Sequence, residues 1–359
     1  MYTILKLILY PHSLLFKFIY CVMELRPYQQ EVFDLINSNN QYYFQLPCGT
    51  GKNIIISEYI NRYPEYRYAV FSPSIYLANE MCRLINRPVN RIFSDKGTEE
   101  EYDISICVYN SWTHLKKRYD ILFVDEAHHF QNGEHDIHLC KIPRKYLFSA
   151  TLINSNYIYH HDEAVNNHYI VDFSMNIHYV DRIDFDKIVN ILETNQQYKH
   201  IIAYCNTKIS AVFFSEKLKY HGITSACVHS SMTRDLITKN INDFKEGKIR
   251  VLVNCYLINE GVDIKICDCA LFVENRHSKV QIIQCIGRMQ RLFEGKNKGN
   301  FICFLDETKN SLISIKRYLR VINDPNYFKA DKKRFNLINN REDQCMLANY
   351  KRINQKILK

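Results

Sequence analysis

A glycine-containing segment between a predicted strand and a predicted helix has the residue types that bind phosphate groups. It consists of Pro47, Cys48, Gly49, Thr50, Gly51, Lys52 and Asn53. The glycines let the backbone curl so that its N–H groups face phosphate oxygens, and the N-terminus of the following helix adds partial positive charge. Lys52 would reach the outer phosphates. The segment therefore predicts a triphosphate site.

The last residue of this segment and the residue just before it depart from the usual phosphate-loop pattern. Leu46 takes the place of the first glycine, and Asn53 takes the place of the Ser or Thr whose hydroxyl normally ligates Mg²⁺. The amide oxygen of Asn53 could reach a metal directly or through water. Metal binding, and with it turnover, would then be weaker than with a hydroxyl at this position.

Two adjacent carboxylates follow a buried strand further along the chain. Residues 121–124 are apolar, and Asp125 and Glu126 come directly after them. The carboxyl ends of the strands are where an open α/β sheet binds its ligand. We predict that Asp125, together with Asn53, holds Mg²⁺ and that Glu126 orients or deprotonates the attacking water.

A third group of residues lies on one face of a predicted helix near the C-terminal end of the chain. Gln284, Gly287, Arg288 and Arg291 are spaced by three and four residues, so they share that face. Two guanidinium groups there could stabilise charge on a γ-phosphate, an effect of roughly 10³-fold or more on the rate. Taken alone, the same pattern is also typical of a basic surface helix.

Short apolar runs alternate with helical patterns in two successive blocks, which predicts two parallel sheets with crossover helices. The first block has predicted strands at 42–46, 67–71, 104–108, 121–124 and 146–148, and helices at 53–62 and 75–85. The second block has predicted strands at 201–205, 225–228, 250–253, 270–273 and 301–305, and helices at 209–220, 234–246 and 279–291. We therefore expect the first block to hold the triphosphate and the second to supply the guanidinium pair.

The order and type of these motifs resemble a superfamily 2 helicase of the Asp-Glu-Ala-His type, in the style of restriction-enzyme subunits and large-DNA-virus ATPases. The resemblance covers about residues 24–291. It implies an α/β fold of two RecA-like parallel-sheet lobes in tandem, ATP and Mg²⁺ as cofactors, and DNA or RNA as the partner. The partner would be contacted mainly at its phosphate backbone.

The same resemblance assigns further residues by their motifs. Arg26 and Gln29 would contact the adenine, and Gly261 and Asp263 would contact the nucleotide from the second lobe. His128, Ser149 and Thr151 would couple hydrolysis to movement of the strand. The nucleic-acid contacts would be Ser72, Pro73, Ser74, Asn110, Thr233 and Asn254. A helix-capping role explains Thr233 as well as a phosphate contact does.

The sequence divides into five segments. We predict an N-terminal extension at 1–22, a first lobe at 23–152, a linker at 153–167, a second lobe at 168–306 and a basic helical tail at 307–359. The uncharged stretches of the extension are too short to span a bilayer, and it lacks a clear signal-peptide cleavage site. We therefore expect no membrane partner and favour Met23 as an alternative start.

The charge and cysteine content narrow the class of protein. The last 51 residues hold 13 Lys and Arg against 4 Asp and Glu, which accounts for the whole net charge of +9. Such a tail suits a phosphate backbone, although a solvated lysine surface has the same composition. The 13 cysteines form no C-x-x-C pair, which favours reduced thiols in an intracellular protein.

The motifs together predict nucleic-acid-dependent ATP hydrolysis that drives a helicase, or a translocase that does not separate strands. A different class of protein also fits: a hydrolysis-impaired clamp or scaffold on nucleic acid, motivated by Asn53. A chain of this size would be a minimal motor recruited by protein partners. The bias toward Asn, Ile, Lys and Tyr suits an AT-rich genome, and with the motif style it suggests a viral protein.

Overall fold

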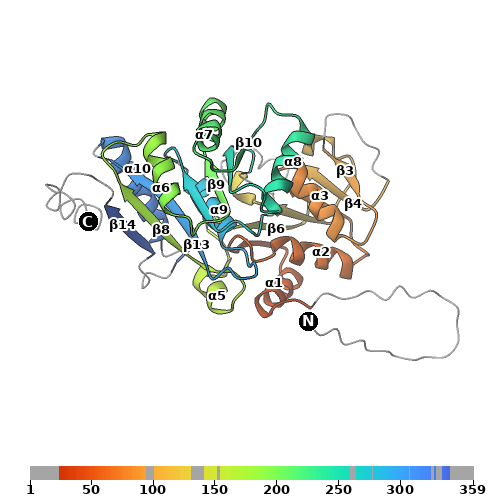
Figure 1. The fold of residues 1–359 in the computed structure, drawn as a ribbon. Coiled ribbons are helices and arrows are strands. Elements are labelled where there is room, and N and C mark those ends of the chain that lie inside the picture. Colours follow the sequence, from red (N-terminus) through yellow and green to blue (C-terminus); the bar gives the residue numbers. More distant parts are fainter. Residues whose placement is uncertain are drawn as a thin grey trace.

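The computed structural model describes residues 24–93, 101–130, 141–151, 154–258, 264–276, 278–306, 308–324, 327–328 and 334–339. Figure 1 shows two sheets side by side, with the short helix α5 (His161–Asn166) below their junction. Each sheet has seven strands, and every strand pair in both sheets is parallel. The predicted architecture of two parallel-sheet lobes in tandem is confirmed.

The first lobe has the strand order β3-β4-β2-β5-β6-β1-β7. Its strands are β1 (Gln41–Gln45), β2 (Tyr68–Ser72), β3 (Asn90–Ile92), β4 (Ile104–Val108), β5 (Ile121–Asp125), β6 (Arg144–Ser149) and β7 (Tyr157–Ile158). Its helices are α1 (Pro27–Ser38), α2 (Lys52–Arg62) and α3 (Ile75–Leu84), with the 3₁₀ turns η1 (Tyr109–His114) and η2 (Ala127–His129).

The second lobe has the strand order β10-β11-β9-β12-β13-β8-β14. Its strands are β8 (Asp172–Tyr179), β9 (Ile201–Tyr204), β10 (Ser225–His229), β11 (Val251–Cys255), β12 (Cys269–Phe272), β13 (Lys298–Leu305) and β14 (Phe335–Asn339). Its helices are α6 (Phe185–Thr194), α7 (Lys208–Tyr220), α8 (Arg234–Lys245), α9 (Lys279–Met289) and α10 (Lys309–Ile322).

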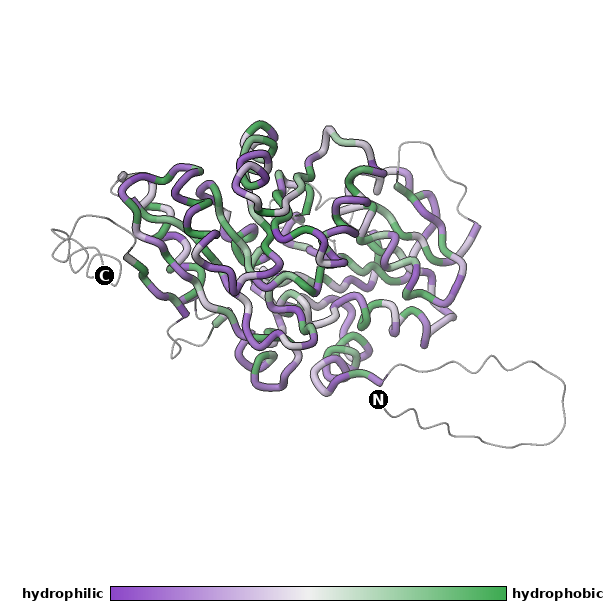
Figure 2. The backbone as a smooth tube through the Cα atoms, in the orientation of Figure 1, coloured by the Kyte–Doolittle hydropathy of each residue, from purple (hydrophilic) through white to green (hydrophobic). Residues whose placement is uncertain are grey.

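The central strands form because both of their faces are covered. Every residue of β2, β4 and β5 is buried, which is the continuous apolar pattern of a parallel sheet between helix layers. Figure 2 shows hydrophobic stretches along the strands in the interior of both lobes. Hydroxyl or carboxylate caps start several helices: Ser74 accepts a hydrogen bond from the Leu77 N–H at α3, and Ser278 accepts one from the Gln281 N–H at α9.

Two segments differ from the sequence prediction. The predicted linker contains β7, which pairs with β1, and the helix α5. The predicted helical tail contains α10 but also β14, which extends the second sheet by pairing with β8. β14 forms because it pairs with the edge strand β8, where Phe335 lies opposite Met175 and Leu337 lies opposite Ile177. Local sequence patterns cannot indicate such a distant partner.

A buried ion pair fastens this last strand to the junction of the lobes. The Arg334 guanidinium, directly before β14, bonds the carboxylate of Asp162 in α5 and lies 3.2 Å from that of Asp172 in β8. It also lies over the ring of Phe328 at 5.2 Å. No helix within the described ranges is long and apolar enough to cross a membrane.

Candidate functional site

The parallel strands bring the predicted catalytic residues of the first lobe to one sheet edge. The phosphate segment follows β1, Asp125 ends β5, and Ser149 ends β6. The register aligns these ends, because Gln45 of β1 lies opposite Ser149 and Asp125 lies opposite Phe148. This is the carboxyl edge at which open α/β sheets bind ligands.

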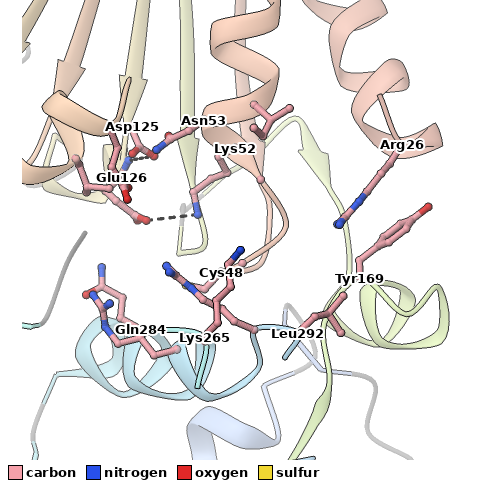
Figure 3. Close-up of a pocket in the computed structure, with 18 residues that line it drawn as sticks. Arg26, Cys48, Lys52, Asn53, Asp125, Glu126, Tyr169, Lys265, Gln284 and Leu292 are labelled. Atoms are coloured by element: carbon pink, nitrogen blue, oxygen red, sulfur yellow. Dashed lines mark hydrogen bonds and ion pairs between the residues drawn. The ribbon is translucent and has the colours of Figure 1, made fainter. Parts of the chain in front are cut away.

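A cleft of about 460 Å³ separates this edge from the second lobe. Its first-lobe wall includes Lys52, Asn53, Asp125 and Glu126, and its second-lobe wall includes Gln284, Arg288 and Arg291. Figure 3 shows Lys52 and Glu126 facing the helix that carries Gln284 across the gap. The structure thus brings together all the residues to which the sequence assigned catalysis.

The phosphate loop adopts a backbone that only glycine accepts easily. Gly49 has φ +81° and Gly51 has φ +89°, both in the left-handed region. A Cβ at Gly51 would come within 2.9 Å of Gln29 Nε2, which donates a 3.2 Å hydrogen bond to the Thr50 carbonyl. The Thr50 hydroxyl donates to the Pro47 carbonyl at 2.7 Å, so the loop is held in shape from within.

Lys52 and Glu126 form a buried ion pair across the floor of the cleft, with Nζ 3.4 Å from Oε1. Burial would lower the pKa of Lys52, but the Glu126 carboxylate holds that pKa above its usual value. Burial would raise the pKa of Glu126, but Lys52 and His128 hold it well below its usual value. Both groups are therefore charged, as a phosphate ligand and a proton acceptor must be. Burial raises the pKa of the Cys48 thiol, so it adds no negative charge beside the phosphate site.

The side chains predicted to couple the lobes form a connected chain from Glu126. Its Oε2 lies 3.5 Å from Nδ1 of His128 and 3.3 Å from the Ser149 hydroxyl, which donates to it. Ser149 Oγ also lies 2.9 Å from His128 Nδ1 and accepts from the Thr151 N–H at 3.2 Å. Glu126 itself has a left-handed φ of 51°, a strained backbone that the surrounding contacts must hold.

The residues at the predicted metal position fit a divalent cation. The carbonyl oxygen Oδ1 of Asn53 is buried and has no hydrogen-bond partner among the described residues. Asn53 and Asp125 line the same cleft, and Figure 3 draws them next to each other. Carboxylate and carbonyl oxygens are the donor set that Mg²⁺ accepts.

The arginine helix approaches the phosphate loop closely enough to exclude any side chain at position 287. A Cβ on Gly287 would lie 2.1 Å from the Cβ of Cys48. This contact places the following residue, Arg288, in the cleft, where it is buried. Arg291 lies beyond the end of α9, at Met289, rather than within the helix, which was predicted to reach 291.

The far end of the cleft contains Arg26, which the sequence assigned to the nucleotide, and three residues that it did not single out. The Arg26 guanidinium lies over the ring of Tyr169 at 4.3 Å, and Lys265 and Leu292 line the same space. Gln29, predicted to contact adenine, is buried and bonds the backbone of Arg26 and Thr50. Tyr169 carried no signal, because it lies outside every motif and the chain has 26 tyrosines.

The predicted nucleic-acid contacts separate into accessible and buried groups. Asn110 and Thr233 are exposed, and Thr233 begins α8 without a side-chain cap bond. Pro73 and Ser74 are half-buried and Ser72 is buried, all where β2 meets α3. Asn254 is fully buried, and its Oδ1 accepts bonds from the N–H groups of the turn that follows. Gly261 and Asp263 lie outside the described residues.

Two family models match the chain, one in each lobe. Residues 22–154 match the model described as "Type III restriction enzyme, res subunit", and residues 184–293 match "Helicase conserved C-terminal domain". These two domains together cover most of the chain, and the predicted resemblance to superfamily 2 helicases is confirmed.

Sequence relatives of this chain include two proteins described as helicases. A putative ATP-dependent helicase of Saccharomyces cerevisiae is 23% identical, over 85% of this chain and 55% of the relative. A probable helicase of African swine fever virus is 26% identical, over 57% of this chain and 28% of the relative. The chain thus spans about half the length, or less, of the curated relatives it matches.

Solved structures support the fold of this chain. Saccharomyces cerevisiae Dbp5 bound to RNA and ADP BeF3 has a TM-score of 0.65 at 19% identity, covering 92% of this chain and 93% of that chain. The ATP-dependent Type ISP restriction-modification enzyme LlaBIII bound to DNA has a TM-score of 0.66 at 16% identity, covering 93% of this chain and 32% of that chain.

Proposed function

We propose that this superfamily 2 helicase hydrolyses ATP with Mg²⁺ when DNA or RNA lies across both lobes, and uses closure of the cleft to move along or separate strands. One observation carries the proposal. Lys52 and Glu126 of the first lobe share a single cleft with Arg288 and Arg291 of the second. A triphosphate held by one lobe is thus within reach of cations from the other.

Each cleft residue has a distinct task in this proposal. The Lys52 ammonium binds the outer phosphates, the Glu126 carboxylate accepts the proton of the attacking water, and Arg288 and Arg291 neutralise charge that develops on the γ-phosphate. Asp125 and Asn53 would hold Mg²⁺, which when bound neutralises phosphate charge. The guanidinium groups act fully only when the lobes close, which links the nucleotide state to domain motion.

The chain of contacts from Glu126 through His128 to Ser149 and Thr151 offers a route for that link. These residues touch one another at the carboxyl ends of two adjacent strands. A shift of Glu126 on hydrolysis would therefore move Thr151, which lies just after β6 and before β7, the last strand of the first lobe. We propose that this cluster transmits the state of the cleft to the segment joining the lobes.

Other features support the place of action and the partner. The structural neighbours named above were solved with RNA or with DNA, and contact with the phosphate backbone needs no sequence preference. Ten cysteines of the described part are free thiols, which supports an intracellular setting, and the similarity to a viral helicase supports a viral origin.

The proposal predicts ATP hydrolysis that depends on nucleic acid. Phosphate release should rise when single-stranded DNA, duplex DNA or RNA is added at constant salt. For a protein that contacts 6–10 phosphates, raising salt from about 50 to 200 mM should weaken binding by about 10³-fold or more. Strand-displacement and triplex-displacement assays in parallel separate a helicase from a duplex translocase. Phosphate release that stays at background with every nucleic acid contradicts the proposal.

A second candidate function is a nucleic-acid clamp that hydrolyses ATP poorly, and Asn53 is the residue that tests it. Because the buried Asn53 Oδ1 is free to face a cation, we expect Asn53→Thr to change the ATP turnover rate by less than about tenfold. Asn53→Ala, which removes the oxygen, should raise the Mg²⁺ concentration for half-maximal activity by about 10- to 100-fold. An Asn53→Thr variant far faster than the parent chain would favour the clamp.

A further inference from the structure

The turn after β11 in the second lobe presents an aromatic ring to solvent beside groups suited to phosphate contact. Tyr256 directly follows the strand and is 49% exposed. Its φ of 57° is in the left-handed region, which a bulky residue adopts only when its surroundings require it. Contacts around the turn therefore hold Tyr256 in a strained backbone conformation with its side chain partly exposed.

The residue that imposes this turn is Asn254. Its side chain is 0% exposed, and its Oδ1 accepts hydrogen bonds from the N–H of Leu257 at 3.0 Å and of Ile258 at 2.8 Å. An asparagine in this role closes the turn around the residue in between. The sequence predicted that Asn254 contacts the nucleic acid, but its buried side chain holds the turn instead. Asn254 thereby positions Tyr256.

A buried cation supports the inner face of the ring. The Arg276 guanidinium carbon lies 4.7 Å from the centroid of Tyr256 and 5.6 Å from that of Tyr204, although Arg276 is only 2% exposed. Its Nη2 donates to the Cys205 carbonyl at 3.0 Å. Within the described ranges Arg276 forms no salt bridge, and its Nε and Nη1 have no hydrogen-bond partner. Contact with the aromatic faces is thus a main stabilisation of this buried charge.

The two strands that flank β11 are followed by residues with hydrogen-bond donors. β11 lies between β10 and β9, so the segments that follow these three strands meet at one sheet edge. Lys208, after β9, reaches Ser231, after β10, with Nζ 2.5 Å from Oγ. Both residues are exposed, as is Thr233 at the start of α8. An ammonium and hydroxyl groups of this kind bind phosphate oxygens.

We propose that Tyr256 is a stacking platform for an unpaired base of the bound nucleic acid, with Arg276 fixing the ring from beneath. This inference rests on the proposed function and adds a contact to the base where the family motifs supply contacts to the backbone. One face of the ring is taken by the guanidinium, so the base stacks on the other. Because the ring is held in place before binding, little conformational freedom is lost when the base arrives. Stacking of this kind tolerates any base.

The test compares binding of a short single-stranded DNA with binding of a matched strand whose sugars carry no bases, at one salt concentration. The parent chain should bind the base-bearing strand about 5- to 100-fold more tightly. Tyr256→Ala should abolish that preference while binding the abasic strand as before, and Tyr256→Phe should keep it. Arg276→Met should reduce the preference without lowering the melting temperature, because it removes a buried charge that has no carboxylate partner among the described residues.

The control is Tyr220→Ala, which removes a tyrosine that is 88% exposed at the end of α7 opposite Lys208. This variant should keep the preference for the base-bearing strand. A Tyr256→Ala variant that still discriminates between the two strands overturns the stacking assignment. A preference unchanged in Arg276→Met overturns the role of the guanidinium. If the parent chain binds both strands equally, the stacking proposal fails and the proposed function stands. If it binds neither, both fail.

Discussion

Glu126→Gln should reduce nucleic-acid-stimulated ATP turnover by about 10²- to 10⁴-fold, the range of a lost general base. The substitution keeps the size of the side chain but removes the charge that accepts the proton. Because Lys52 and His128 hold the pKa of Glu126 well below its usual value, the parent carboxylate is ionised throughout the neutral range. The rate of the parent chain should therefore not fall through protonation of Glu126 between about pH 8 and pH 6.

Two measurements separate this effect from a loss of structure or of nucleotide binding. Asp125 remains near Lys52 in the variant and still favours its charged form, so a fluorescent ATP analogue should bind with little change in affinity. Asp120→Asn is the matched control, because Asp120 precedes the opposite end of the same strand, β5, in a surface pair with Arg67. That exposed pair contributes at most about 1 kcal/mol, so turnover should be unaffected. Turnover that survives in Glu126→Gln would refute the mechanism proposed here.

Which residues meet in the cleft was easier to predict from the sequence than the last elements of the fold, for a physical reason. Phosphate loops, acidic strand ends and arginine helices combine residue types that few other structures need, and each sits at a strand or helix terminus that local periodicity locates. Lys52, Asp125, Glu126 and Arg288 therefore appear in one cleft as expected. The elements that the sequence failed to predict are those that form against distant partners. β14 pairs with β8 from the other end of its lobe, and no local sequence pattern indicates this strand.

The sequence also could not predict which way individual side chains point. Asn254 has the residue type of a nucleic-acid contact, but its amide is used by the turn behind it. Tyr169 and Tyr256 reach the cleft and the sheet edge without any motif, because a tyrosine is informative only once its neighbours are known. In both cases the neighbour that gives the ring a role is an arginine far along the chain, Arg26 or Arg276. Pairings of this kind depend on tertiary structure.

Gly287→Ala should lower stimulated ATP turnover by about 10²-fold or more while leaving the fold intact. The added Cβ would lie 2.1 Å from the Cβ and 2.9 Å from the Sγ of Cys48, so α9 must retreat from the phosphate loop. A displacement of about 1 Å at a catalytic group costs roughly 10²-fold, and complete loss of an arginine finger costs 10³-fold or more. Alanine is a better helix former than glycine by about 1 kcal/mol, so thermal unfolding should not occur at a lower temperature.

A second substitution in the phosphate loop shows whether the contact between the lobes is the cause. Cys48→Gly removes both clashing atoms and leaves the Cα of residue 48 at 3.5 Å, an ordinary contact distance, so Cys48→Gly combined with Gly287→Ala should regain turnover relative to Gly287→Ala alone. Cys48→Ala keeps the Cβ and should not rescue it. Comparison with the two single Cys48 variants removes any direct effect on phosphate binding. A fully active Gly287→Ala chain would mean that α9 does not pack against the loop during turnover. Rescue by glycine but not by alanine would tie the position of Arg288 to this one contact between the lobes.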